Sequence, residues 1–197
     1  MRVLVLYCHP LDDSFNAAVH RAAVEALRAA AREVDDCDLY AEDFDPVLRG
    51  DERLRYHDLA HNREGVEPYV QRLLQAQALV LVFPVWSFGL PAMLKGWFDR
   101  VLVPGVSFHL EARGRIRPGL THLRHIVGIA TYGTPRWKAW LMADPPRAAV
   151  KRFLKRLSAG RARADYLACY HMNVASAARR ERFLREVQAG MRELVVG

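Results

Sequence analysis

The sequence lacks a long hydrophobic run and the pattern of a secretion signal. Its longest apolar stretch, residues 78–88, is far shorter than the ~20 residues that a membrane-spanning helix needs, so we expect no stable membrane insertion. The beginning of the chain has no basic region followed by an apolar core and a small-residue cleavage site, so we expect a cytoplasmic protein. Hydrophobic residues make up 51% and charged residues 26% of the chain, which excludes wholesale disorder.

Cysteine is scarce and unpaired. The chain has 3 cysteines, Cys8, Cys37 and Cys169, and none forms a C-x-x-C pair. Each lies in or beside an apolar, strand-like stretch. We therefore expect buried, reduced thiols rather than a disulfide framework, a redox pair or a metal site.

Charge is unevenly distributed along the 197 residues. The net charge is +7, yet residues 1–135 carry 15 basic and 17 acidic side chains, whereas residues 136–197 carry 14 and 5. A basic stretch around residues 147–163 could attract an anionic surface, a nucleic acid or a phosphate-bearing small molecule, or simply face solvent. No helix-turn-helix, zinc-finger or RNA-binding signature accompanies it, so we expect no nucleic-acid partner.

Apolar strand-like runs alternate with helical patterns over the whole chain, which favours one domain spanning residues 1–197. The pattern predicts strands at Val3–Tyr7, Asp36–Tyr40, Leu79–Phe83, Ile126–Ala130 and Ala164–Tyr170, and helices near residues 14–32, 66–77, 91–101, 146–157 and 175–194. Residues 43–64 are polar and are expected to be irregular. This order predicts an α/β fold, a flavodoxin-like, three-layer, doubly wound arrangement with a five-stranded parallel sheet in the order 2-1-3-4-5.

Ligands of such folds bind beyond the carboxyl ends of the strands, where the strand order reverses. The first loop there reads H-P-L-D-D-S-F-N and leads into a helix, whose free amide groups favour an anion. His9, Ser14 and Asn16 add polar side chains. It matches neither a P-loop nor G-x-G-x-x-G, and the plainer interpretation, with Ser14 as a helix cap and His9 as a turn residue, stays open.

Two further loops converge on the same predicted edge. The stretch F-P-V-W-S-F-G-L-P places Pro84, Val85, Trp86, Ser87 and Phe88 after the third strand, where aromatic side chains could line a flat conjugated ligand or serve as core or interface residues. The stretch T-Y-G-T-P places Thr131, Tyr132, Gly133 and Thr134 after the fourth, with hydroxyl groups and a glycine that allows close approach. Convergence of the loops predicts a ligand site.

The first loop after its strand, together with F-P-V-W-S-F-G-L-P-A-M-L-K-G-W-F-D-R-V at Phe83–Val101, resembles the NAD(P)H:quinone oxidoreductase family of flavodoxin-like flavoproteins. The resemblance implies a homodimeric enzyme that binds FAD or FMN and transfers two electrons from NAD(P)H to a quinone or similar flat acceptor. Hydride would pass through flavin N5 in ping-pong turnover.

Residue by residue, the resemblance assigns cofactor contacts to each loop. His9, Phe15 and Asn16 match positions that hold the phosphate and ribityl portion. Residues 85–88 match the loop that lines the isoalloxazine ring. Residues 131–134 match the loop at the N1/O2 side of that ring. Trp86, Phe88, Phe108 and Tyr132 would enclose flat rings, with Trp86, Phe108 and Tyr132 contacting the substrate.

The sequence departs from the family where a proton relay would lie. The well-studied members carry a Tyr and a His soon after the third loop, whereas no histidine occurs here between His125 and His171. Tyr132 and Lys138, or Arg136, are the candidates that remain for a catalytic role. Trp86-Ser87 also replaces a polar residue followed by Trp. Alternative functions are a flavin-binding regulatory subunit of a membrane transporter and, from another class, a nucleic-acid-binding module.

Overall fold

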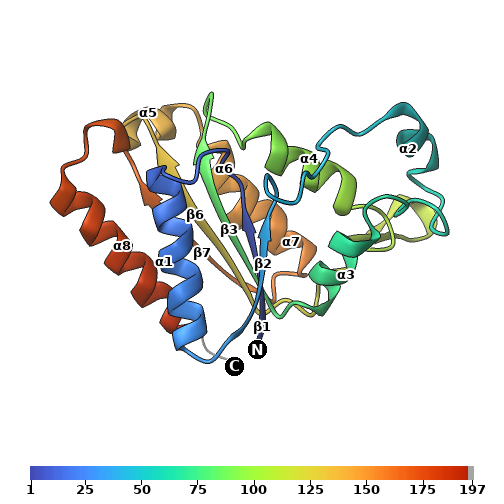
Figure 1. Cartoon of the computed structure of the whole chain (residues 1–197). Coiled ribbons are helices and arrows are strands. Elements are labelled where there is room, and N and C mark those ends of the chain that lie inside the picture. Colours follow the sequence, from blue (N-terminus) through green and yellow to red (C-terminus); the bar gives the residue numbers. More distant parts are fainter. Residues whose placement is uncertain (195–197) are drawn as a thin grey trace.

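The structure, a computed structural model, describes residues 1–194 and is built on a parallel sheet with helices on both faces (Figure 1). The strands are β1 (Arg2–Tyr7), β2 (Glu33–Asp38), β3 (Ala78–Val85), β6 (His125–Tyr132) and β7 (Arg163–Cys169). They pair in parallel in the order β2-β1-β3-β6-β7. The predicted fold class and strand order are confirmed. The numbering jumps because β4 (Phe108–Leu110) and β5 (Ile116–Pro118) form a separate antiparallel pair.

Helices cover the sheet in two layers. On one face lie α1 (Phe15–Ala29) and α8 (Ala177–Arg192), which pack side by side (Figure 1). The other face is covered by α3 (Glu67–Gln75), α4 (Ala92–Val101) and a continuous helical run of α6 (Pro145–Ala148), the π-helix η2 (Ala149–Leu154) and α7 (Lys155–Leu157). Short elements complete the chain: α2 (Gly50–Arg55), η1 (Ala112–Gly114), α5 (Arg136–Leu141) and η3 (Met172–Val174).

The strands are apolar throughout because both of their faces are buried. Val3 and Val5 pack toward α1 and α8, whereas Leu4 and Leu6 belong to the core on the opposite face. The cysteines are free and buried, as expected. Burial raises the pKa of the Cys8 thiol to about 12, so it remains protonated and unreactive at neutral pH.

Several elements differ from the sequence prediction. The second strand covers Glu33–Asp38 rather than Asp36–Tyr40, and the segment predicted to be irregular contains α2. The helix predicted at residues 146–157 is interrupted by η2. The helix predicted at residues 175–194 is slightly shorter, because α8 covers Ala177–Arg192. The start of β2 was misplaced because the strand carries three aspartates and a glutamate, residues that are uncommon in strands.

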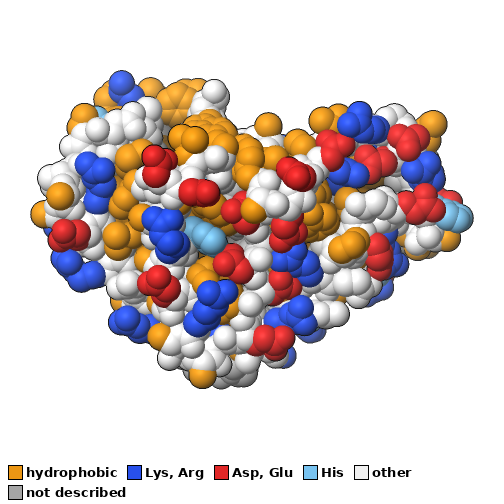
Figure 2. Space-filling view, viewed as in Figure 1, with side chains coloured by type: hydrophobic (Ala, Val, Ile, Leu, Met, Phe, Trp, Pro, Cys, Tyr) orange, Lys and Arg blue, Asp and Glu red, His pale blue; other side chains and the backbone are white. Residues whose placement is uncertain are grey.

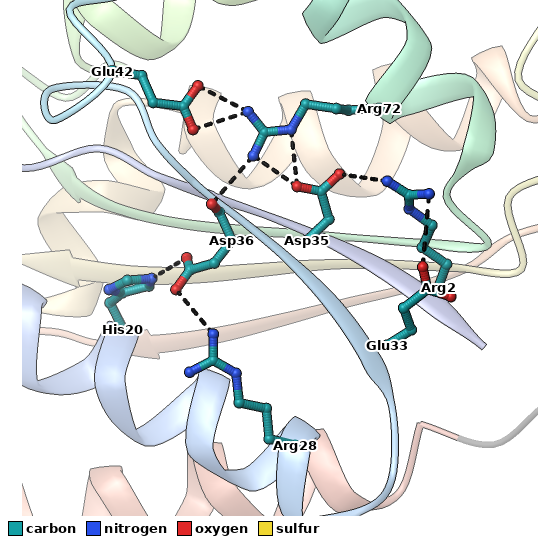
Figure 3. A network of polar contacts seen from close by, with 8 residues as sticks. All are labelled: Arg2, His20, Arg28, Glu33, Asp35, Asp36, Glu42 and Arg72. Carbon is teal, nitrogen blue, oxygen red and sulfur yellow. Dashed lines mark hydrogen bonds and ion pairs between the residues drawn. The ribbon is translucent and has the colours of Figure 1, made fainter.

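Cations from neighbouring elements neutralise the acidic edge strand (Figure 3). Arg72 of α3 donates to Asp35 at 2.9 Å and to Glu42 at 2.8 Å. Arg2 of β1 donates to the other oxygen of Asp35 at 3.2 Å. On the opposite side, His20 of α1 lies 2.7 Å from Asp36. These contacts tie β2 to β1, α1 and α3, so the edge strand is held by charge as well as by its backbone ladder.

Asp35 is mostly buried within this network. Burial alone would raise its pKa, but the hydrogen bonds from Arg72 and Arg2 outweigh that effect and hold the pKa below its usual value. A carboxyl group with a lowered pKa in the folded state stabilises the fold above its unfolded pKa of about 3.9, and this contribution disappears as the pH falls through the folded pKa.

We expect Asp35→Asn to lower the free energy of unfolding by about 2 kcal/mol at pH 7, because two charge-assisted hydrogen bonds lose their anionic acceptor. The difference from the wild type should shrink as the pH falls below about 4. Urea unfolding at both pH values measures it. The control is Asp45→Asn, whose exposed pair with Arg49 is screened by solvent and should contribute much less to stability. Equal effects of the two substitutions would contradict the argument.

Among residues 1–194 no helix combines the length and apolar character that crossing a bilayer requires.

Candidate functional site

The loops after β1, β3 and β6 meet at the carboxyl edge of the sheet. The Asn16 Nδ2 atom donates to Thr131 Oγ1 at 3.2 Å, which joins the first loop to the third. The rings of His9 and Trp86 lie 5.9 Å apart between centroids, which joins the first loop to the second. The structure therefore brings together residues 9–16, 86–89 and 131–134, the segments that the sequence singled out.

The first loop delivers polar groups to the start of α1. Ser14 caps the helix, its Oγ accepting the amide hydrogen of Ala17 at 3.0 Å, while its backbone oxygen accepts from Ala18. The remaining amide groups of the first turn have no acceptor inside the helix. Burial lowers the pKa of His9, and its Nδ1 atom accepts from the Leu11 amide at 3.1 Å. His9 is therefore neutral at pH 7 and acts as a hydrogen-bonding group rather than a cation.

Phe15 and Asn16 lie on different sides of the first turn. The Phe15 ring packs against Phe183 of α8, with 6.3 Å between centroids. Asn16 is only 3% exposed, and its Oδ1 atom is buried without a hydrogen-bond partner. A buried amide oxygen without a donor is uncommon in folded proteins, and it marks this position as a place for a ligand donor.

The second loop is a strained turn. The Gly89 amide donates to the Trp86 carbonyl at 2.8 Å, and the central residues Ser87 and Phe88 have φ angles of 49° and 59°. Positive φ at both central positions is the signature of a type I′ turn, which normally contains Asn or Gly. The turn leaves the Trp86 side chain 44% exposed at the sheet edge. Pro84 and Val85 precede it as the last residues of β3.

The third loop divides its residues between the two faces of the sheet. Thr131 points to α1, as its bond with Asn16 shows. Tyr132 points the opposite way, is 1% exposed and packs on Tyr170 with 4.5 Å between ring centroids. Gly133 and Thr134 follow at the edge, where the Thr134 carbonyl accepts from the His171 amide at 2.8 Å.

The Tyr132 hydroxyl belongs to a half-buried polar cluster that sequence reasoning missed. It donates to Asp144 Oδ1 at 2.5 Å and lies 2.6 Å from the Tyr166 hydroxyl. Tyr170 donates to the other oxygen of Asp144 at 3.1 Å. Burial raises the pKa of Tyr132 far above its usual value, so the hydroxyl stays protonated. One signal was present in the sequence: Tyr166 and Tyr170 stand four residues apart in a predicted strand and so share a face.

Two other candidates lie away from the meeting point of the loops. Phe108 begins β4 and lines an apolar groove of about 550 Å³ with Phe98, Phe153 and Leu90, the residue after the second loop. Lys138 is exposed on α5, with its ammonium 5.4 Å from the centre of the Trp137 ring. Neither Trp86 nor Tyr132 is among the residues that line this groove.

The residues at the edge fit a phosphate-bearing, planar cofactor. Amide groups at the start of the 15-residue helix α1 and the Ser14 hydroxyl suit a phosphate. The unpartnered Oδ1 of buried Asn16 suits a hydroxyl donor, and the exposed indole of Trp86 suits a flat ring. No cluster of His, Cys, Asp or Glu in residues 1–194 is arranged to hold a metal ion.

Relief of the strain in the second loop should stabilise the chain. We expect Ser87→Gly to raise the free energy of unfolding by about 0.5–1 kcal/mol, because glycine adopts the positive φ without the steric cost that serine incurs. Urea unfolding measures the change. Ser87→Ala is the matched control: it keeps the β-carbon, so it should give no gain. A gain with alanine equal to that with glycine would contradict the strain argument.

Comparisons with known proteins agree with this fold. The flavodoxin-like fold family matches residues 1–194. The chain is 38% identical over 123 residues to NAD(P)H dehydrogenase [quinone] 1 of Rattus norvegicus, covering 54% of this chain and 45% of the rat protein. The chain thus matches about half the length of such curated relatives.

Solved structures extend the similarity over nearly the whole chain. The NAD(P)H:quinone oxidoreductase of Methanothermobacter marburgensis superposes with a TM-score of 0.82 at 26% identity, covering 99% of both chains. Smu.1420 of Streptococcus mutans UA159 gives a TM-score of 0.83 at 27% identity, covering 98% of this chain and 100% of that one. The chain belongs to the flavodoxin-like fold family, and its relatives include quinone reductases, as the sequence motifs indicated.

Proposed function

We propose that the protein is a flavin-dependent NAD(P)H oxidoreductase that passes two electrons to a quinone or similar flat aromatic acceptor. The observation that carries this proposal is the meeting of the loops, in which Asn16 bonds to Thr131 and His9 contacts Trp86. The relatives named as quinone reductases in rat and in Methanothermobacter marburgensis support the same chemistry. The cofactor would be FAD or FMN, with NAD(P)H as the electron donor.

Each loop would hold a different part of the flavin. The amide groups at the start of α1 and Ser14 would bind phosphate, and Asn16 with Thr131 would hold the polar chain of the cofactor. Residues 85–88 and 133–134 would border the ring. The bound flavin would supply the hydride and electron transfer, which no protein side chain provides.

The chain's own residues would control access and charge around the ring. Trp86 presents an exposed indole against which a nicotinamide or a quinone could stack. Use of that face by donor and acceptor in turn would give ping-pong kinetics. Tyr132 would contribute its backbone at the edge, because its hydroxyl is already held by Asp144 and Tyr166 and remains protonated.

We further propose that the protein acts as a homodimer. The apolar groove lined by Phe98, Phe108 and Phe153 supports this, since Phe153 is 48% exposed. Figure 2 shows hydrophobic side chains along the upper edge of the molecule, between its body and the part that carries α2. Light scattering of the purified chain should give twice the mass of 22.4 kDa.

The decisive experiment is a flavin titration followed by a turnover assay. The purified chain should quench the fluorescence of added FMN or FAD and then oxidise NADPH or NADH with benzoquinone, giving parallel double-reciprocal plots. Identification of the released cofactor distinguishes FAD from FMN. Flavin binding with negligible turnover would support the regulatory-subunit alternative instead. Failure to bind either flavin would refute the proposed function.

Asn16→Ala should weaken flavin binding about tenfold, because it removes a buried hydrogen-bonding amide worth about 1.5 kcal/mol. The dissociation constant from fluorescence titration measures the loss. Asn62→Ala is the control: this half-buried asparagine also has an unpartnered Oδ1, but its amide donates to the Tyr56 and Pro104 carbonyls, away from the loops. The control should lower stability and leave flavin affinity unchanged. Equal losses of affinity would remove Asn16 from the site.

A further inference from the structure

A cationic cavity of about 760 Å³ lies beside the third loop, between α5, the α6–η2 helix and the end of β7. Its charged lining consists of Arg136, Arg147, Lys151, Arg152 and a single acid, Asp144. The cavity adjoins the proposed flavin site, because Arg136 follows the third loop closely and Tyr170 precedes His171, whose amide bonds to Thr134. A volume of this size suits a nucleotide.

The four cations of this cavity have no acidic partner. Throughout residues 1–194, no carboxylate comes within ion-pairing distance of any of them, although Arg2, Arg72 and Arg100 elsewhere all form such pairs. Four unneutralised cations around one cavity repel one another, and an anionic ligand would relieve that repulsion.

The half-buried tyrosine cluster engages Asp144 in hydrogen bonds, so this carboxylate forms no ion pair with the four cations. The Asp144 oxygens accept hydrogen bonds from Tyr132 and Tyr170, so hydroxyl groups rather than guanidinium groups satisfy the carboxylate. The Arg147 guanidinium instead lies over the Tyr166 ring, 5.3 Å from its centre. Gly128 makes this packing possible, since a β-carbon there would come within 2.6 Å of the Tyr166 ring. The arrangement leaves the cationic side chains available to the cavity.

The cavity also has a flat aromatic wall. Trp140 lines it and is 78% exposed, which is unusual for a tryptophan. An exposed indole can stack on a purine base, while arginine and lysine bind phosphate oxygens. Aromatic stacking next to phosphate contacts is the recognition pattern of an adenosine phosphate.

We propose that this cavity binds the adenosine phosphate part of the nicotinamide dinucleotide donor, with the base against Trp140 and the phosphates among Arg136, Arg147, Lys151 and Arg152. The inference rests on the proposed function and adds to it a binding site for the donor's adenosine end. Since the cavity carries a surplus of positive charge, it favours NADPH, which has an additional phosphate, over NADH.

The helix offers a closely matched pair of variants. Lys151→Gln/Arg152→Gln removes two cations that line the cavity, whereas Lys155→Gln/Arg156→Gln removes a lysine and an arginine that are exposed four residues further along and do not line it. Both lower the net charge equally, so long-range electrostatic effects should be similar. Only the first variant should lose specific contacts.

Calorimetric titration of the flavin-free chain with adenosine 2′,5′-bisphosphate tests binding without turnover. The first variant should weaken binding about ten- to hundredfold, and the control by less than about threefold. With the flavin-loaded enzyme, the first variant should raise KM for NADPH more than kcat changes, while FMN and FAD affinities stay at the wild-type values. Trp140→Ala should weaken bisphosphate binding, whereas Trp137→Ala, which changes an exposed tryptophan outside the cavity, should not.

Each contrary result is distinguishable. Wild-type chain that does not bind the bisphosphate, or equal weakening in the two charge variants, would overturn the proposal while leaving the flavin chemistry intact. Weakened FAD binding with an unchanged KM for NADPH would also overturn it, because the cavity would then serve the cofactor. Loss of flavin binding by the wild type would instead refute the proposed function itself.

Discussion

The parallel pairing of β1 with both β2 and β3 is the constraint on which the rest of the structure depends. It aligns Leu4 with Leu79 and places Tyr7 beside Val82, so the loops that follow these strands start at the same height of the sheet. The pairing of β3 with β6 extends the same alignment to Thr131 and Tyr132. Loops from distant parts of the chain are thereby brought to a common edge, and the contacts of Asn16 with Thr131 and of His9 with Trp86 follow from it.

Charge supports this sheet where hydrophobic burial is weak. The central strands are buried on both faces, but β2 has little apolar surface and depends on Arg2 and Arg72 to neutralise Asp35 and Glu42. At the opposite side of the molecule the reverse arrangement occurs: the carboxylate of Asp144 is satisfied by tyrosine hydroxyls, and the arginines beside it stay without acidic partners. The same chain thus uses arginine for cohesion at one edge and presents it to a cavity at the other.

Sequence reasoning predicted the fold because a parallel strand buried on both faces is a short, continuous apolar run, as in residues 79–83. It also located the loops, since topology alone determines where they meet. It could not predict the direction of the Tyr132 side chain, because β6 continues two residues beyond the predicted end at Ala130. Alternation along the strand then sends Thr131 toward α1 and Tyr132 into the opposite core. Asp144 escaped notice because its partners, Tyr132, Tyr166 and Tyr170, converge only in the folded sheet.

The π-helix η2 interrupts the helix that carries the cationic side chains. A π turn closes with a hydrogen bond to the fifth residue along rather than the fourth, so it holds one residue more than an ordinary helical turn. Arg147 precedes this segment, and Lys151 and Arg152 lie inside it, yet all three line the same cavity. A π segment absorbs this extra residue, so deletion of one residue from η2 would restore α-helical geometry while the helix on either side kept its orientation. Loss of a single codon within η2 would therefore shorten this basic helix without turning α7 away from the sheet.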